Sequence, residues 1–218
     1  TELREASYLV DVGVEEREYL LKRNREWMQR VPGGGQLRLL NLMVSEACNF
    51  GCHHCLHRCS VDANPTHGDK KLMDWETAKR AIDFYLDITQ RWEGGETTNV
   101  HFGSAEPLLN WSVVEMATEY IRTSRPNLSL AINTNLSLLT EQMAVFLRDH
   151  GIYISTSLDG PSRGNDAIRT FSSGKGTFET IVSKIELLAK IGYPLDGLSI
   201  TLNNLNFGAV TSEFIDWA

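Results

Sequence analysis

Residues 37–55 read LRLLNLMVSEACNFGCHHC and join a nearly continuous apolar run to a loop that carries three cysteines. The apolar part suits a strand that is buried on both faces, as the strands of parallel sheets are. The cysteines follow with the spacing C-x3-C-x2-C, at Cys48, Cys52 and Cys55, and the chain has one more, Cys59. Thiols gathered in this way indicate a metal site in a reducing cytoplasm, because a disulfide framework would join distant segments.

Beyond this stretch the sequence alternates between strand and helix patterns. Further strands are expected at 98–102, 128–133, 152–158 and 198–202. Amphipathic helices are expected at 75–86, 111–122, 140–147 and 177–192, with another from 211 onward, and Asp74, Thr140 and Thr177 are the expected caps of three of them. Strands that alternate with helices predict an α/β fold with a parallel sheet and right-handed crossovers.

Polar residues follow the predicted strands at the points where the strands end. Ser104 and Glu106 come after the second strand, Asn135 after the third, and Ser157 and Asp159 at the end of the fourth. In barrel-like parallel sheets, the chemistry takes place at the carboxyl ends of the strands. We therefore expect these residues to share a site with the three cysteines.

The composition is that of a globular protein, with 42% hydrophobic and 22% charged residues among 218. Its net charge of −7 argues against a nucleic acid partner, because an acidic surface repels phosphates. No run approaches the roughly 18 apolar residues of a membrane span, and no apolar signal core is visible. Residues 1–36 are expected to form an N-terminal extension, with a strand at 7–12 and a helix at 15–29, before a core domain at 37–218.

Three thiolates on one short loop can hold three irons of a cubane cluster and leave the fourth iron for a small molecule. In this spacing the chain resembles the radical S-adenosylmethionine (SAM) superfamily. The resemblance implies a [4Fe-4S] cluster held by Cys48, Cys52 and Cys55, with SAM on the open iron and His54 packed on its adenine. It also implies that one electron from the reduced cluster cleaves SAM to a 5′-deoxyadenosyl radical, which takes a hydrogen atom from the substrate.

Two further segments resemble motifs of this superfamily. Residues 101–109, HFGSAEPLL, are similar to the G-G-E-P-L-L motif after the second strand, with Ser104-Ala105 in place of the two glycines and Glu106 retained. The resemblance implies that the small residues approach the methionyl amine of SAM and that Glu106 balances its charge. Residues 134–136, TNL, resemble a T-N-G element after the third strand, which implies a cofactor contact for Asn135.

A longer match indicates a branch of the superfamily. SLDGP at 157–161, Arg169, and GKGTF at 174–178 closely resemble a stretch of radical enzymes that modify peptides and proteins, such as the anaerobic sulfatase maturases. By this resemblance Ser157 hydrogen-bonds the cofactor, Arg169 pairs with its carboxylate, and Asp159 shapes the turn. Many of these enzymes carry a C-terminal cysteine-rich SPASM domain.

The resemblance implies a partial (β/α)6-type barrel. Five strands are found, so the chain is expected to be truncated after the fifth strand, with the C-terminal part absent, and no catalytic acid or base is assigned. The expected substrate is a peptide or protein, and the expected reductant is a donor of flavodoxin or ferredoxin type. Two alternatives stay open. One is a radical SAM enzyme that acts on a small molecule in cofactor biosynthesis, and the other is a non-catalytic zinc or iron–sulfur module completed by Cys59, His53, His54 or His57.

Overall fold

The computed structural model describes Lys22 and residues 38–55, 72–90 and 99–217 of the chain. The strand expected at 7–12 and most of the helix expected at 15–29 lie outside these residues, and so does Cys59. Apart from Lys22, the described residues belong to a unit that begins at Arg38. The division into an extension and a core domain stays a prediction.

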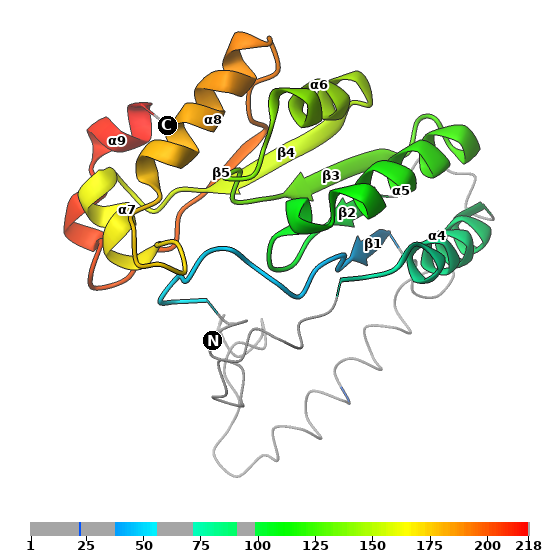
Figure 1. Ribbon diagram of the computed structural model, residues 1–218, viewed down its shortest axis with the longest axis horizontal. Helices are drawn as coiled ribbons and strands as arrows, with labels where there is room; N and C mark the ends of the chain where they lie inside the picture. The colour runs from blue at the N-terminus through cyan, green and yellow to red at the C-terminus, as the bar shows by residue number, and fades with distance from the viewer. Residues whose placement is uncertain (1–21, 23–37, 56–71, 91–98, 218) are drawn as a thin grey trace. The chain divides into compact units, whose positions relative to one another are not determined.

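Five parallel strands form a single sheet in sequence order (Figure 1). They are β1 (Leu39–Leu42), β2 (Asn99–Phe102), β3 (Ser129–Asn133), β4 (Ile152–Ser157) and β5 (Gly197–Ser199). Each new strand pairs with the strand before it, which is the order of a barrel wall. The predicted α/β partial barrel is confirmed.

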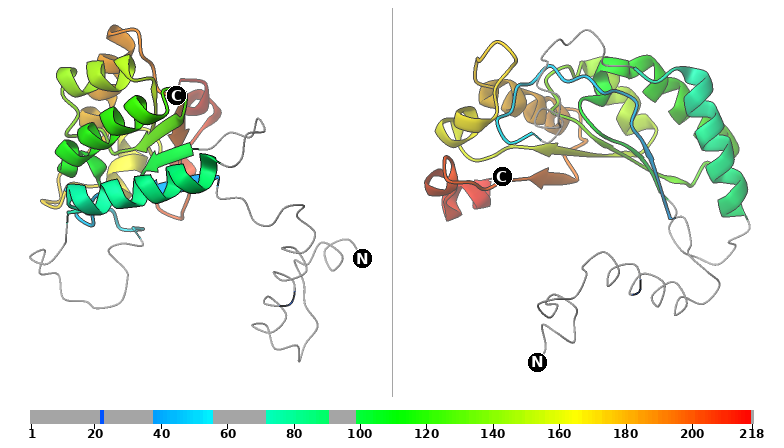
Figure 2. Two further views of the ribbon diagram at one scale, coloured as in Figure 1. Left: turned by 90° about the vertical axis from the view of Figure 1, so that its right-hand side faces the viewer. Right: turned by 90° about the horizontal axis from the view of Figure 1, so that it is seen from below.

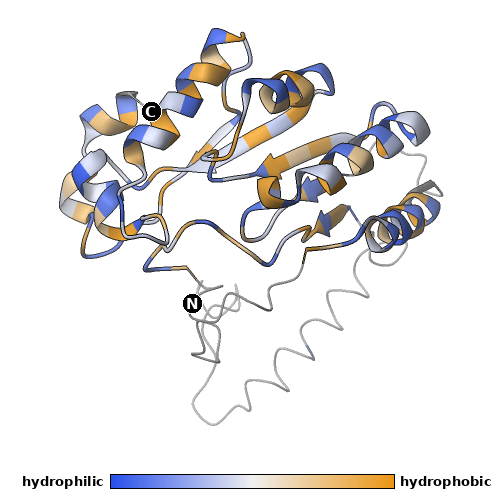
Figure 3. Cartoon of the chain, viewed as in Figure 1, coloured by the Kyte–Doolittle hydropathy of each residue, from blue (hydrophilic) through white to orange (hydrophobic). Residues whose placement is uncertain are grey.

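The longer helices lie together on one side of this sheet (Figures 1 and 2). They are α4 (Trp75–Gln90), α5 (Trp111–Ser124), α6 (Glu141–Asp149) and α8 (Phe178–Lys190), and the chain also forms α7 (Ser162–Ile168), α9 (Ser212–Trp217) and the 3-10 turns η1 (Pro107–Asn110) and η2 (Phe207–Ala209). Figure 3 shows apolar residues along β3 and β4 and mixed apolar and polar residues along the helices. In the part of the chain that the structure describes, none of the helices has the length and apolar content needed to cross a membrane.

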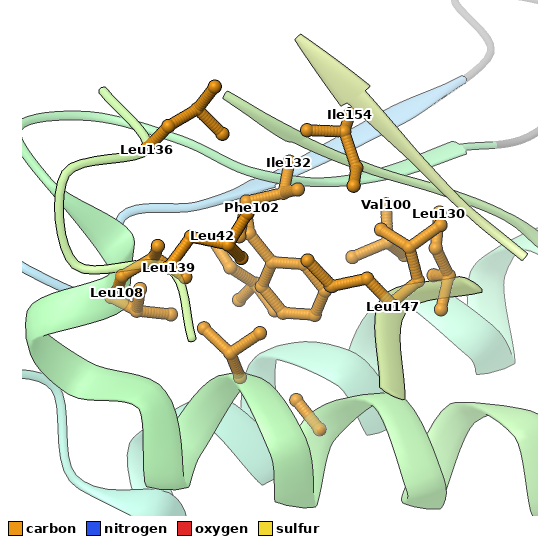
Figure 4. Packing of buried hydrophobic residues seen from close by; sticks show 14 of the residues in the cluster. Leu42, Val100, Phe102, Leu108, Leu130, Ile132, Leu136, Leu139, Leu147 and Ile154 are labelled. Carbon is orange, nitrogen blue, oxygen red and sulfur yellow. The ribbon is translucent and has the colours of Figure 1, made fainter. Parts of the chain in front are cut away.

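Alternate strand residues build the core between the sheet and these helices. Phe102, Ile132 and Ile154 are fully buried and lie close together (Figure 4). On the opposite face the side chains are more open, and Leu39 and Tyr153 are exposed by 53% and 54%. The prediction that the first strand is buried on both faces is therefore wrong, because the helices cover only one of them.

Helix caps follow the predicted residues in two cases and differ in a third. Asp74 accepts a bond from the N–H of Thr77 (2.7 Å), and Thr140 from that of Met143 (3.2 Å). For α8 the predicted cap Thr177 is the N-cap residue, but its side chain makes no capping bond, and its N–H instead donates to Oδ1 of Asp166 at 2.8 Å. The carboxylate that caps α8 thus comes from α7, a helix that the sequence analysis did not predict.

The last strand is shorter than expected because its continuation bonds elsewhere. β5 ends at Ser199, although the strand pattern continues to Leu202. The N–H of Thr201 donates to Oδ1 of Asp159 (2.8 Å), and its carbonyl accepts from the side chain of Asn206 (2.8 Å). Polar side chains thus replace the neighbouring strand as partners of this backbone.

Candidate functional site

The cysteine loop is held against the distant segment 168–172, which begins at the last residue of α7. The N–H groups of Gly51 and His53 donate to backbone carbonyls of this segment at 2.7 and 2.8 Å. The rings of Phe50 and Phe171 meet edge to face, with centroids 5.0 Å apart. Two stretches that resemble motifs of the same superfamily therefore lie side by side.

Hydrogen-bond donors point at the sulfur atoms of two cysteines. Sγ of Cys48 accepts from the N–H of Phe50 (3.4 Å) and from the side-chain amide of Asn135 (3.7 Å). Sγ of Cys52 accepts from Nη1 of Arg169 (3.7 Å). Burial raises the pKa of Cys48 to about 11 and also raises the pKa of Cys52. Thiolates at these positions need a positive charge beside them, which bound metal supplies.

The donor set fits a cluster with three cysteine ligands. Cys48, Cys52 and Cys55 are free thiols on one loop. Within 38–55, 72–90 and 99–217, no three His, Cys, Asp or Glu side chains are gathered closely enough to hold one metal ion. A cubane cluster places each cysteine on a different iron, so its ligands surround a larger object than a single ion. Cys59 and His57, the further zinc ligands considered above, lie outside the described residues.

A buried carboxylate joins the loops after β2 and β3. Oε1 of Glu106 accepts from the N–H of Leu108 (3.0 Å) and the hydroxyl of Thr134 (2.6 Å), and Oε2 accepts from the N–H of Asn135 (2.7 Å). Burial raises the pKa of Glu106, while these donors oppose that rise. The N–H of Glu106 also donates to the carbonyl of Ala47, so this residue is tied to the cysteine loop as well.

Asn135 connects the loop after β3 with the cysteine loop. Its Nδ2 donates to Oδ1 of Asn49 at 2.9 Å, in addition to its contact with Cys48. Its Oδ1 accepts from the N–H and the hydroxyl of Ser137. The loops after β1, β2 and β3 thus meet through side chains of the segments that the sequence singled out.

The backbone keeps the shape of glycine-containing motifs although the glycines are absent. Among the described residues, the non-glycine residues with positive φ are Ser104 (71°), Ala105 (26°) and Leu136 (62°). These are the positions at which the resembled motifs have glycine. A residue with a Cβ pays about 1–2 kcal/mol for this conformation, so the loop geometry is imposed by the surrounding contacts.

Arg169, Asp159 and His54 form a cluster beside Cys52. Nε of Arg169 donates to Oδ2 of Asp159 at 2.9 Å, and Nη2 lies 2.8 Å from the same oxygen as an ion pair. Nε2 of His54 lies 3.7 Å from the same oxygen and 3.4 Å from Nη2 of Arg169. Nδ1 of His54 is buried without a hydrogen-bond partner among the described residues, and burial lowers the pKa of this imidazole. The cofactor contacts expected for Arg169 and His54 stay predictions.

Some residues of the site were not expected from the sequence. Ser157, which was expected, ends β4 opposite Ser199 of β5. Asn49, Asn165 and Asn206 were not singled out, yet each makes side-chain bonds that join separate segments of the chain. Asn49 had a signal, since it lies between two cysteines of the motif. Asn165 lies in the short helix α7 and Asn206 in an irregular turn, and both are fully buried at positions that no periodic pattern marks.

Comparison with known families decides the superfamily. Residues 42–207 match the family described as the Radical SAM superfamily. The chain belongs to this superfamily. The matched residues contain the cysteine loop, the Glu106 and Asn135 loops and Arg169.

Several known radical SAM proteins are similar to this chain. A radical SAM cyclopropyl synthase of Paramaledivibacter caminithermalis is 22% identical over 100% of this chain and 46% of its own length. The serine-type anaerobic sulfatase-maturating enzyme of Bacteroides thetaiotaomicron is 27% identical over 75% of this chain and 39% of its own length. An uncharacterized protein of Methanocaldococcus jannaschii is 29% identical over 83% of this chain and 58% of its own length. The chain thus spans about half the length of these relatives.

Solved structures have the same fold. The structure of native anSMEcpe with bound AdoMet superposes with a TM-score of 0.60 at 24% identity, over 73% of this chain and 43% of that one. A second anSMEcpe structure, with AdoMet and a peptide bound, gives a TM-score of 0.59 at 23% identity. This match covers 73% of this chain and 41% of that one. At this identity the likeness extends to the fold alone.

Proposed function

We propose that this radical SAM chain holds a [4Fe-4S] cluster through Cys48, Cys52 and Cys55, with SAM beside it, in an enzyme that modifies a peptide or protein side chain. The observation that carries the proposal is the meeting of the three-cysteine loop with Asn135 on one side and Arg169 on the other. When bound, the cluster supplies one electron that cleaves SAM and generates the 5′-deoxyadenosyl radical.

The residues of the chain position this cofactor pair. The three cysteines hold the cluster, and the loop of Ser104 and Ala105 lets SAM approach the backbone after β2. The Glu106 carboxylate is fully buried and accepts three hydrogen bonds within the protein, so it would balance the charge of the methionyl amine across the loop it holds. Ser157 is a half-buried residue at the end of β4, on the carboxyl edge of the sheet, where its hydroxyl would bond the cofactor.

A peptide or protein substrate is supported by the relatives. The sulfatase-maturating enzymes and a mycofactocin maturase of Mycolicibacterium smegmatis are among them, the latter 26% identical over 168 residues. A reductant of flavodoxin or ferredoxin type and a cytoplasmic location follow from the same proposal. The small-molecule alternative also has support, because an AdoMet-dependent heme synthase of Oleidesulfovibrio alaskensis is 26% identical over 178 residues.

Anaerobic reconstitution tests the cofactor. We expect about four irons and four sulfides per chain and a visible absorption that air bleaches. Adding SAM to the reduced protein should change its electron paramagnetic resonance (EPR) signal, because a ligand reaches the open iron. Stoichiometric zinc without sulfide, after purification without oxygen, would contradict the proposal and favour the zinc module.

The substrate class is tested with the full-length gene product. Formation of 5′-deoxyadenosine is measured with a library of synthetic peptides and, in parallel, with small-molecule substrates such as porphyrins. Stimulation by peptides with a matching mass change supports the proposal. Stimulation by porphyrins alone favours the small-molecule alternative.

A further inference from the structure

The guanidinium of Arg169 lies between a buried carboxylate and a cysteine sulfur. Nε donates to Oδ2 of Asp159 at 2.9 Å, Nη2 forms an ion pair with the same oxygen at 2.8 Å, and Nη1 donates to Sγ of Cys52 at 3.7 Å. Asp159 is fully buried, and Arg169 is 8% exposed. One planar, rigid group thus connects a negative charge of the protein with a proposed cluster ligand.

Both members of this ion pair are fixed by further bonds. Oδ1 of Asp159 accepts from the N–H of Thr201 (2.8 Å), and its backbone carbonyl accepts from the buried side chain of Asn206 (2.9 Å). The N–H of Arg169 donates to the carbonyl of Asn165 at 2.7 Å. Because Asp159 is fixed and Nε of Arg169 donates to its Oδ2, the guanidinium is oriented with Nη1 directed at Cys52.

Fold stability is a poor explanation for such a pair. Removing two charges from water costs free energy that their attraction often fails to recover, so a buried ion pair adds little net stability. Asp159 and Cys52 together accept hydrogen bonds from two of the five N–H groups of Arg169, and the Asp159 carboxylate also forms an ion pair with Nη2. The specific consequence of the arrangement is a charged hydrogen-bond donor at one of the three cysteine sulfurs.

We propose that Asp159 positions Arg169 to donate a hydrogen bond to the Cys52 thiolate and thereby raises the reduction potential of the cluster, an inference that rests on the proposed function above. A donor at a ligand sulfur withdraws negative charge, which stabilises the reduced cluster more than the oxidised one. Reduction moves one electron from the donor protein to the cluster, and no bond forms or breaks.

The test is the midpoint potential of the reconstituted full chain, followed by EPR without SAM. Arg169→Met removes the donor, and Arg163→Met is the matched control, because Arg163 is an exposed residue of the neighbouring α7 and the net charge changes equally. At a fixed potential, the ratio of reduced to oxidised cluster should fall about tenfold in Arg169→Met, which corresponds to a midpoint potential lowered by about 59 mV for a one-electron couple. In Arg163→Met this ratio should fall by less than about twofold.

Equal potentials in the two variants, at full iron content, overturn the proposal. A role of Arg169 in binding the SAM carboxylate alone predicts that equality, since SAM is left out. If the protein without substitutions assembles no iron–sulfur cluster, the proposed function is contradicted instead. Failure of this inference can therefore be distinguished from failure of the proposed function.

A second variant covers loss of the cluster. If Arg169→Met binds no iron, Arg169→Lys replaces it, because lysine keeps the charge but lacks the fork that contacts Asp159 and Cys52 together. A potential equal to that of the unchanged protein then overturns the proposal. If neither variant binds iron, the double variant Asp159→Asn, Arg169→Met removes both charges and leaves no unpaired buried carboxylate. A potential equal to that of the unchanged protein in this variant overturns the proposal, and loss of iron from it as well assigns the pair to cluster assembly and overturns a role limited to the potential.

Discussion

The hydroxyl of Thr134 donates a 2.6 Å hydrogen bond to Oε1 of Glu106 and so joins the loop after β3 to the loop after β2. Oε2 of the same carboxylate accepts from the N–H of Asn135. The side chain of Glu106 is fully buried at this junction. A change at Glu106 therefore alters the arrangement of the loops as well as any contact with a cofactor.

Glu106→Gln is expected to destabilise the fold. The amide NH2 group of glutamine would face an N–H or O–H donor, and a buried donor left without an acceptor costs about 1–3 kcal/mol. Glu119→Gln, on the exposed side of α5, should change the free energy of unfolding by less than about 0.5 kcal/mol. Urea unfolding of the apoproteins measures both, and equal stabilities would show that Glu106 does not hold the loops together.

Each of the three cysteines in the C-x3-C-x2-C motif should be required for the cluster. Replacing Cys48, Cys52 or Cys55 with alanine removes the protein ligand of one iron, so iron content after anaerobic reconstitution should be lost. Cys59→Ala is the control and should retain the iron. Retention in Cys55→Ala together with loss in Cys59→Ala would show that the ligands were assigned wrongly.

The sequence predicted the order of strands and helices because their periodic patterns are strong. α7 was missed because its sequence, SRGNDAI, has no apolar stripe. Its place depends on tertiary contacts instead, since the close approach of Ala209 leaves no room for a Cβ at Gly164. The exposure of the far face of β1 was also missed, because a run of apolar residues does not reveal how many faces are covered.

The sequence predicted which loops meet at the site, but it predicted fewer of the side-chain contacts between them. Parallel strands bring their carboxyl ends to one edge, so motifs that follow successive strands were expected to meet. The bonds from Arg169 to Asp159 and Cys52 join three separate segments, and no local pattern encodes such a contact. The positive φ of Leu136 is contrary to its residue type, and only the glycine of the resembled T-N-G element pointed to it.

Asp166→Ala should weaken α8. The carboxylate accepts from the N–H groups of Thr177 and Phe178 at 2.8 and 2.9 Å, and the loss of such a cap costs about 0.5–2 kcal/mol. Asp87→Ala, at an exposed position in α4, is the control for loss of a surface carboxylate. Hydrogen exchange should increase in the first turn of α8 in Asp166→Ala alone. Unchanged exchange there would leave Thr177 as the effective cap.

Stability should depend on pH through His101. Burial lowers the pKa of this imidazole below its ordinary value of 6.5. The unfolded chain then binds the proton more readily, so the contribution of neutral His101 is complete above pH 6.5 and is lost as the pH falls through the lowered pKa. His101→Gln does not titrate. The stability of the unchanged protein relative to this variant should therefore decrease between about pH 7.5 and about pH 5. A constant difference would show that folding leaves this pKa unperturbed.

Ala105→Gly and Leu136→Gly should change stability in opposite directions. Both relieve a positive φ worth about 1–2 kcal/mol, and both add flexibility to the unfolded chain that costs about 0.4–1 kcal/mol. Ala105 loses only a methyl group, so the free energy of unfolding of Ala105→Gly should rise by up to about 1 kcal/mol. Leu136 is fully buried, and truncating such a side chain costs about 2–5 kcal/mol, which exceeds the relief. Urea unfolding of the two apoproteins measures the difference. Destabilisation of Ala105→Gly would mean that its backbone conformation is not strained, and stabilisation of Leu136→Gly would mean that its packing contributes less than the strain it imposes.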